Sequence, residues 1–245
     1  TSVNLFKVLS AALALRPDRR VILSDNGNFP TDLYVAQNLA GALGKGHKVL
    51  TPPPETVAEA LDETVAVLML TEVDYRTGRR HDMAALTAKA HAAGALVIWD
   101  LAHSAGAFPV DLAGAQADFA VGCGYKYLNG GPGAPAFAYA APRHHDALLP
   151  ALAGWFGHAE PFAFDPDWRP TTGADRLRTG TWPVLSLTAL DAALTLWDGI
   201  DLAAVRARSE ALTSRIIERE EPLCGDALTH ATPSAPAARG SQDAI

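Results

Sequence analysis

The sequence predicts an α/β fold, in which a mostly parallel sheet carries helices on both faces. Two observations support it: short runs that are apolar throughout alternate with segments of helical spacing, and prolines or glycines separate many of them. Strands that are apolar on both sides are typical of parallel sheets, because helices cover both faces. The chain of 245 residues suits one large domain of this kind, or one domain with part of a second.

The first elements follow from apolar spacing. Residues 1–20 contain a semi-apolar run whose amphipathic spacing fits a surface helix better than a signal peptide. "RRVILSD" (19–25) predicts a short buried strand. "TDLYVAQNLAGAL" (31–43) predicts a helix with Thr31 or Asp32 as its N-cap, because short polar side chains accept hydrogen bonds from the first free backbone amides.

The middle of the chain continues the alternation. "HKVLTPPP" (47–54) predicts a strand that ends at its prolines, and "ETVAEALDE" (55–63) predicts a helix. "TVAVLMLT" (64–71) predicts a nearly continuous apolar strand. "DMAALTAKAHAAGA" (82–95) predicts a helix that ends at a glycine, and "ALVIWD" (95–100) predicts the next strand.

The last strands come before residue 142, and helical patterns follow. "ADFAVGCG" (117–124) and "PAFAYA" (135–140) predict two more strands. "WPVLSLTALDAALTLWDGI" (182–200) and "LAAVRARSEALTSRIIEREE" (202–221) have helical spacing and are expected to lead out of the domain. We therefore expect a large domain over residues 1–200, then a connecting helix and the start of a truncated small domain over 201–245.

Composition excludes several classes of protein. The formal net charge of −7 and the absence of a dense Lys/Arg cluster argue against a nucleic-acid partner. No apolar run reaches the roughly 20 residues that a membrane span requires. Cys123 and Cys224 lack the spacing of a metal site, so we expect no metal and two buried thiols in a reducing compartment, the cytoplasm. Because the chain starts without methionine, we expect a piece of a longer product.

Four polar side chains fall at or just beyond the ends of predicted strands: Thr71, Asp100, His103 and Lys126. In open parallel sheets, ligands bind beyond the carboxyl ends of the strands, so these groups are expected to share one rim. A carboxylate in a segment as apolar as "ALVIWDLAHSAGA" needs a partner, and a protonated ring nitrogen would serve. Taken alone, Asp100 also fits a helix cap and His103 an ordinary core histidine.

The segment "GCGYKYLNGGPGAP" makes Lys126 the most specific candidate. It lies between Tyr125 and Tyr127, and a run of glycine and proline follows it. A buried lysine has a lowered pKa and can attack an aldehyde to form a Schiff base. Together with Asp100, which would keep a pyridine nitrogen protonated, this lysine suits pyridoxal 5'-phosphate.

The motifs also resemble those of a known family. "WDLAHSAGAFPVDLAGAQADFAVGCGYKYLNGGPGAPAF" is similar to kynureninases, which are fold type I pyridoxal-phosphate enzymes, and "SDNGNFPTDLY", "DYRTGRRHDM", "GWFGH" and "LRTGTWPVLSL" match in the same order. The resemblance extends from Thr1 to about Ser241. It implies hydrolysis of L-kynurenine or its 3-hydroxy form to anthranilate (or 3-hydroxyanthranilate) and L-alanine, a step of tryptophan catabolism on the kynurenine pathway toward NAD.

The resemblance also implies site residues. Lys126 would be the aldimine lysine, Asp100 the partner of the pyridinium nitrogen, and Tyr125 a phosphate contact and proton donor. Trp155 and Thr181 would reach the phosphate of the partner subunit, which implies an obligate homodimer. Taken alone, Trp155 also fits core or interface packing. The other implied cofactor contacts are Thr1, Ser2, Phe29, Pro30, Thr31, Asp32, Thr71 and His103.

Two alternatives stay open. Other fold type I enzymes, such as cysteine desulfurases or lyases, need a mobile catalytic cysteine, and neither Cys123 nor Cys224 is well placed in the sequence. The family's carboxylate-binding arginine would lie beyond the sequence given, so an inactive cofactor-binding fragment is the second alternative. No motif distinguishes kynurenine from 3-hydroxykynurenine.

Overall fold

A computed structural model describes residues 1–227 and 229–244, and its centre is a six-stranded sheet. Five neighbouring strands are parallel, and only β6, at one edge, runs antiparallel to its neighbour β5. This arrangement confirms the predicted fold class. In spatial order the strands are β2 (Lys48–Leu50), β1 (Val21–Leu23), β3 (Val65–Thr71), β4 (Leu96–Asp100), β5 (Phe119–Cys123) and β6 (Ala136–Ala140).

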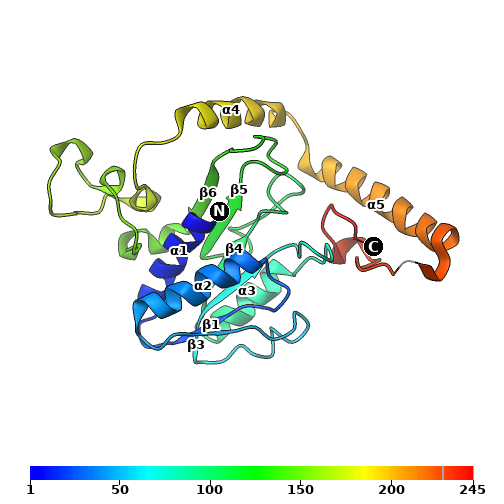
Figure 1. The fold of residues 1–245 in the computed structure, drawn as a ribbon, viewed down its shortest axis with the longest axis horizontal. Helices are drawn as coiled ribbons and strands as arrows, with labels where there is room; N and C mark the ends of the chain where they lie inside the picture. Colours follow the sequence, from blue (N-terminus) through cyan, green and yellow to red (C-terminus); the bar gives the residue numbers. More distant parts are fainter. Residues whose placement is uncertain (228, 245) are drawn as a thin grey trace.

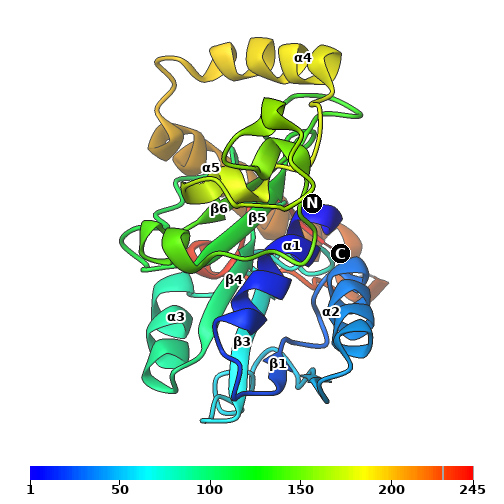
Figure 2. The ribbon, with the colours of Figure 1, turned by 90° about the vertical axis from the view of Figure 1, so that its left-hand side faces the viewer.

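Helices cover both faces of the sheet. Helices α1 (Ser2–Ala14) and α2 (Pro30–Leu43) pack on the side chains of one face, and α3 (Met83–Ala92) packs on the other, as Figure 2 shows. Alternate residues of a strand therefore enter different cores: Met69 lies in the first and Leu70 in the second. This two-sided burial is the reason why β3 and β4 are apolar up to their last residues.

The helix expected at the chain start is correct, but its description as a surface helix is wrong. Helix α1 is mostly buried, because it packs between α2 and the sheet and also against the segment near Leu177. Even Lys7 is buried, and its amine donates to the carbonyl of Leu177 at 2.8 Å. Amphipathic spacing indicates which face of a helix is apolar, and it does not reveal how many neighbours surround the helix.

Two further expectations need correction. Helix α2 begins at Pro30 with Phe29 as its N-cap, not at Thr31 or Asp32. Proline suits the first helical position, where the missing N–H would have no partner. Residues 55–63 form turns rather than a helix, and among them only Val57 is buried. With so little apolar surface to bury, this segment gains too little to offset the cost of nucleating a helix.

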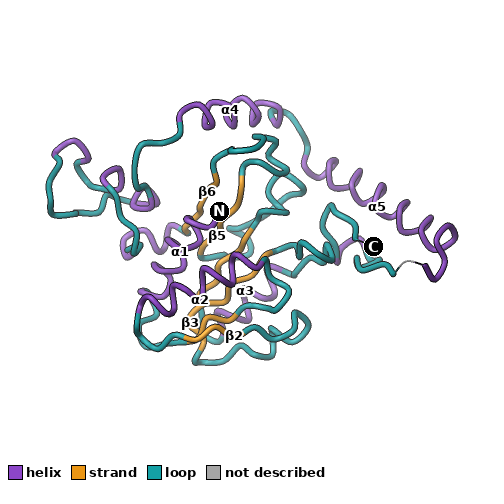
Figure 3. Tube along the Cα trace, in the orientation of Figure 1, coloured by secondary structure: helices purple, strands orange, loops and turns teal. Residues whose placement is uncertain are grey.

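The chain after β6 lies outside the sheet. Helices α4 (Val184–Leu194) and α5 (Leu202–Cys224) extend away from it, and the segment after them returns toward the loop that follows β3, as Figures 1 and 3 show. There the backbone N–H of Gly240 donates to Gly78, and the N–H of Arg80 donates to Ala238. Seven short 3₁₀ helices span Pro142–Ala147, Trp155–Gly157, Pro161–Ala163, Gly173–Leu177, Thr195–Trp197, Gly225–Ala227 and Pro236–Ala238 in the described part of the chain.

Among the described residues, no helix combines the length and the apolar character that crossing a membrane requires.

Candidate functional site

A cavity of about 280 Å³ lies at the carboxyl ends of the parallel strands. Residues that follow β1, β3, β4 and β5 meet there with the start of α1, as expected for ligand sites in open α/β sheets. Most of the residues predicted for the site are brought together in its wall. The lining residues are Thr1, Ser2, Phe29, Asp32, Thr71, Tyr75, Asp100, Ala102, His103, Tyr125 and Lys126.

The amine of Lys126 contacts an imidazole in this cavity. Its Nζ lies 2.7 Å from Nε2 of His103, and Nδ1 of His103 lies 3.4 Å from the carbonyl oxygen of Val73. A carbonyl only accepts, so Nδ1 carries the proton and Nε2 is left as an acceptor for the amine. Burial lowers the pKa of His103, and the charge of Lys126 lowers it further. Both effects favour the neutral imidazole that this contact requires.

Glycines shape the loop that presents Lys126. The N–H of Gly130 donates to the carbonyl of Gly124 at 2.9 Å, which closes the loop around the lysine. A Cβ on Gly130 would lie 2.7 Å from that carbonyl oxygen, so no other residue fits there without displacing the backbone. Gly131 has φ +72°, a left-handed conformation that favours glycine. The glycine run therefore holds the lysine in place by close backbone approach.

Two carboxyl groups share the opposite part of the wall. Asp100 ends β4 and is buried, and Asp32 is buried in the first turn of α2. Burial raises the pKa of Asp32 to about 8, and the like charge of Asp100 adds to the rise. Burial also raises the pKa of Asp100, although the Ala102 N–H donates to its Oδ1 at 2.6 Å. The pair therefore holds a proton at neutral pH.

An aromatic side chain and a helix start complete the cavity. The ring of Phe29 is 43% exposed and so presents an open apolar surface to a ligand. Tyr75 packs edge-on against it, with ring centroids 5.2 Å apart. Thr1 is the N-cap of α1 and lies in the wall with Ser2. The first backbone amides of a helix have no intrahelical acceptor, which suits an anion such as phosphate.

The remaining predicted residues lie outside this cavity. Pro30 and Thr31 are partly exposed and do not line it, although their helix start places Phe29 and Asp32. Trp155 and Thr181 lie on a separate lobe, where the N–H of Phe156 donates to the carbonyl of Thr179 at 3.4 Å. Within one chain, the structure does not bring these two residues to the lysine.

Sequence reasoning missed Tyr75 and Ala102 as lining residues. Tyr75 belongs to the quoted motif "DYRTGRRHDM", but nothing in the sequence indicates that it packs on Phe29. Ala102 lies between two predicted residues, Asp100 and His103, and this position could have suggested it.

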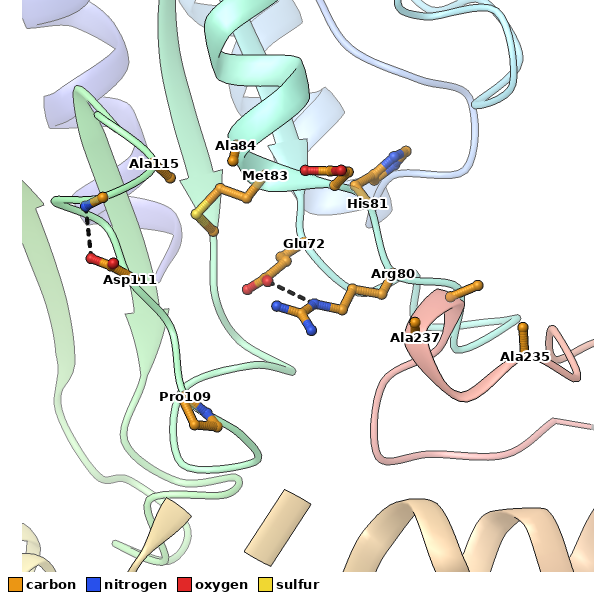
Figure 4. A pocket seen from close by; sticks show the side chains of 13 residues that line it. Glu72, Arg80, His81, Met83, Ala84, Pro109, Asp111, Ala115, Ala235 and Ala237 are labelled. Atoms are coloured by element: carbon orange, nitrogen blue, oxygen red, sulfur yellow. Dashed lines mark hydrogen bonds and ion pairs between the residues drawn. The ribbon is translucent and has the colours of Figure 1, made fainter. Parts of the chain in front are cut away.

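A second, larger cavity of about 780 Å³ contains none of the predicted residues. Figure 4 shows it between the start of α3 and the segment around Ala237. The carboxylate of Glu72 is buried there and accepts from Nε of Arg80 at 3.0 Å. This ion pair offsets only part of the cost of burial, which raises the pKa of Glu72. The lysine and the paired acids that point to catalysis lie in the smaller cavity.

The residues of the smaller cavity fit pyridoxal phosphate. Oδ2 of Asp32 is buried and has no hydrogen-bond partner among the described residues, so a protonated ring nitrogen would supply a missing donor. Phe29 offers a flat apolar face, the start of α1 offers amide donors, and Lys126 offers an amine. These are the groups that an aromatic aldehyde with a phosphate requires.

Comparison with known proteins places the chain in a family. The family model described as "Aminotransferase class-V" matches residues 7–231. The chain belongs to the aminotransferase class-V family. The class-V fold is also found in a solved cysteine desulfurase from Thermococcus onnurineus, which superposes with a TM-score of 0.77 at 22% identity over 98% of this chain and 59% of that one.

Curated class-V relatives carry a more specific name. A protein named kynureninase from Deinococcus radiodurans is 58% identical over 99% of this chain, and one from Pseudomonas fluorescens is 50% identical over 98%. The resemblance to kynureninases is thereby confirmed. The chain spans 59% of the length of each of these relatives.

Proposed function

We propose that this chain is the cofactor-binding part of a kynureninase, which hydrolyses the Cβ–Cγ bond of L-kynurenine or its 3-hydroxy form with pyridoxal phosphate. The products would be anthranilate (or 3-hydroxyanthranilate) and L-alanine. The observation that carries the proposal is one cavity at the strand ends, into which the amine of Lys126 and the carboxyl of Asp100 both open. The curated kynureninases at 58% and 50% identity support the choice of substrate.

The paired acids would hold the cofactor ring. When bound, pyridoxal phosphate supplies a protonated pyridine ring that accepts electrons from the substrate carbon. The carboxyls of Asp32 and Asp100 would face that nitrogen and keep its proton, which favours the ionised form of at least one acid. Phe29 would pack on the ring face, and the start of α1, with Thr1 and Ser2, would bind the phosphate.

Lys126 and Tyr125 would move the protons of the reaction. Lys126 would bind the aldehyde at rest and would take the α-proton of the substrate once its amine is free. His103 accepts from that amine through Nε2 and so orients its lone pair. Tyr125 lines the same cavity, and burial raises the pKa of its phenol, so at neutral pH it holds a proton that it can deliver to the β-carbon.

A homodimer would complete each site with Trp155 and Thr181 of the other subunit. Trp155 packs with Phe156, Phe162 and Phe164 on a lobe that Figure 1 shows projecting from the sheet. Phe162 and Phe164 are 74% and 75% exposed, and Trp182, which stacks on Phe156, is also exposed. Neighbouring exposed apolar side chains of this size are typical of a protein interface. A second copy of the chain is the occupant that we propose.

The proposal also covers organisation and location. Residues 1–200 would form the cofactor-binding domain, and residues 201–245 the connection to a small domain. Cys123 and Cys224 are free thiols, and only Cys123 is buried, so the expectation of a buried thiol is wrong for Cys224. The protein would act in the cytoplasm on a small amino acid.

An assay of product fluorescence tests the activity. Purified chain and a version extended to the length of its relatives would be given kynurenine and pyridoxal phosphate, and anthranilate would be measured. We expect turnover in the extended version. No turnover in either version would contradict the enzyme proposal and leave only a cofactor-binding role. A borohydride-reducible visible band, recorded in parallel, reports cofactor binding separately.

Mixed dimers test the shared site. Lys126→Ala and Trp155→Ala chains are each expected to be defective alone, but in a mixture the Lys126→Ala chain supplies Trp155 to the intact lysine of its partner. We expect the mixture to regain part of the wild-type activity and cofactor affinity. A mixture that stays as defective as its two components would contradict the shared site.

The desulfurase alternative is not favoured. Its chemistry needs a mobile cysteine, and Cys123 is a buried residue of β5 whose thiol lies 3.8 Å from the carbonyl of Ala102. Cys224 ends α5, which Figure 1 shows far from the carboxyl ends of the strands. Assaying sulfide release from cysteine distinguishes the two reactions.

A further inference from the structure

We propose that Asn28 is a positioning residue, which fixes the direction of the Thr71 hydroxyl so that this hydroxyl only accepts hydrogen bonds from the cofactor. The proposal rests on pyridoxal phosphate binding in the cavity described above. Asn28 itself lies behind the cavity wall, is only 5% exposed and does not touch the space that the ligand would fill. Asn28 acts through two neighbours that line the cavity, Phe29 and Thr71.

The orientation of the Asn28 amide follows from its partners. The backbone N–H of Phe29 donates to Oδ1 of Asn28 at 2.7 Å. Because a backbone N–H can only donate, the side-chain atom facing it is the oxygen. The partners of the amide nitrogen support the same orientation, because Nδ2 donates to Oγ of Ser24 at 3.0 Å and to the carbonyl of Met69 at 3.4 Å. Ser24 can accept there because its own proton goes to Met69 at 2.7 Å.

The same oxygen determines the direction of the Thr71 hydroxyl. Oγ1 of Thr71 forms a hydrogen bond with Oδ1 of Asn28. The amide oxygen has no proton, so the hydroxyl of Thr71 must donate. Its single proton is then used behind the cavity wall, and only its lone pairs remain for the cavity. A ligand group that lies against Thr71 must therefore supply the proton of that hydrogen bond.

The side chain of Asn28 thus hydrogen-bonds two parts of the cofactor site that follow or end different strands. Phe29 follows β1 and Thr71 ends β3, and these strands are neighbours in the sheet. Through its oxygen, Asn28 links the start of α2, where the aromatic ring projects, to the end of β3, where the hydroxyl lies. A change at Asn28 is therefore expected to alter the electronic state of the cofactor as well as its placement.

The chemical consequence is a pH effect with a defined sign. An accepting hydroxyl stabilises the protonated form of the cofactor group that faces it, whereas a donating hydroxyl stabilises the deprotonated form. In Asn28→Ala the hydroxyl of Thr71 loses its acceptor and is free to donate into the cavity. The pH midpoint of the visible spectrum of the loaded protein should therefore fall, by roughly one unit if one hydrogen bond reverses.

The experiment is a double-mutant cycle read from the spectrum. The extended protein is loaded with pyridoxal phosphate, and its visible band is titrated in wild type, Asn28→Ala, Thr71→Val and the double variant. Thr71→Val removes the hydroxyl, so adding Asn28→Ala to it should leave the midpoint unchanged. Asn28→Asp keeps an oxygen that accepts from both partners and adds negative charge, so its midpoint should stay or rise.

Each outcome decides the proposal. A lower midpoint in Asn28→Ala that disappears in the Thr71→Val background supports it. An unchanged or higher midpoint in Asn28→Ala, or the same fall in the absence of the hydroxyl, overturns it. If Asn28→Ala does not fold, a lower midpoint in Asn28→Asp overturns the proposal, and an equal or higher midpoint supports it. A wild-type protein that forms no visible band refutes cofactor binding itself, which is a distinguishable result.

Discussion

The amine of Lys126 lies 2.7 Å from Nε2 of His103, although the two residues follow different strands. The Val73 carbonyl accepts from the other ring nitrogen, so the imidazole is left with one lone pair, directed at the lysine. The nucleophile and a neutral acceptor are thus adjacent before any ligand binds.

Lys126→Ala should abolish the visible, borohydride-reducible band that pyridoxal phosphate gives with the wild-type protein. No other lysine lines the cavity among the described residues, so no other side-chain amine there can form a Schiff base with the aldehyde. Absorbance spectra before and after reduction measure this. Lys89→Ala, on the exposed side of α3, is the matched control and should keep the band. A band that persists without Lys126 would show that another amine is used.

Protonation of His103 should lower the free energy of unfolding of the cofactor-free protein as the pH falls. Burial, and secondarily the charge of Lys126, lower the pKa of His103 below 6.5, so the unfolded chain takes up a proton first. Stability therefore rises with pH from the lowered pKa up to about 6.5 and is lost in acid. The effect should be under about 1 kcal/mol, because the ring is partly exposed.

Urea unfolding of wild type and His103→Gln across this pH range measures that difference. The glutamine variant keeps a hydrogen-bonding group but does not titrate, so its stability should depend less on pH. Equal slopes for the two proteins would contradict the assignment of a lowered pKa to His103.

Asp32→Asn should stabilise the unloaded protein increasingly as the pH rises. Burial, and then the charge of Asp100, raise the pKa of Asp32 to about 8 from 3.8, so folding favours its protonated form. Below about pH 4 the carboxyl of Asp32 is protonated in both states and does not destabilise the folded wild type. Between about pH 4 and pH 8 the free energy of unfolding falls, because the unfolded chain ionises first, and above about pH 8 it changes no further. The variant, which cannot ionise, should gain roughly 2 kcal/mol or more over this range.

Denaturant unfolding at several pH values, without cofactor, tests the acid pair. The difference between the Asp32→Asn variant and wild type should be small near pH 4 and largest at pH 8. A difference that does not change with pH would mean that Asp32 is ionised throughout, and that the two carboxyls do not share a buried environment.

Gly154→Ala should separate the two segments that carry Trp155 and Thr181. A Cβ at position 154 would lie 2.0 Å from the backbone oxygen of Thr179, and backbone cannot yield as a flexible side chain can. We expect a loss of roughly 2 kcal/mol or more in unfolding free energy. Gly41→Ala is the control: its Cβ meets nothing within 4 Å, and it lies inside α2. That change should stabilise by about 1 kcal/mol. Equal effects would contradict the close packing.

The sequence predicted the central strands well because they are buried on both sides. Val65–Thr71 and Leu96–Asp100 are buried at every position, so their apolar runs have little other explanation. The segment 55–63 misled the prediction, because its helical composition has only Val57 to bury. Local propensity was outweighed there by the lack of a packing surface.

Part of the candidate site could also be predicted from the sequence. Asp100 and Lys126 were predicted from their places at strand ends, where parallel sheets bind ligands. The roles of Asn28 and Tyr75 were not, because Asn28 accepts from a hydroxyl 43 residues away and Tyr75 packs on Phe29, from which α2, β2 and β3 separate it in the chain. Such partners are set by strand order, which no local pattern specifies.

By itself, the sequence determined which segments form the apolar strands of the sheet and which strand ends carry polar groups, and it indicated Lys126 as the candidate for the reactive amine. Apolar periodicity and unusual local composition report the environment of a residue, because burial and backbone freedom act on each position separately. Only the tertiary structure decided that Asp32 lies beside Asp100 and that His103 accepts from Lys126. Those relationships depend on distances between segments remote in the chain, and the packing of α1, α2 and the parallel strands fixes them.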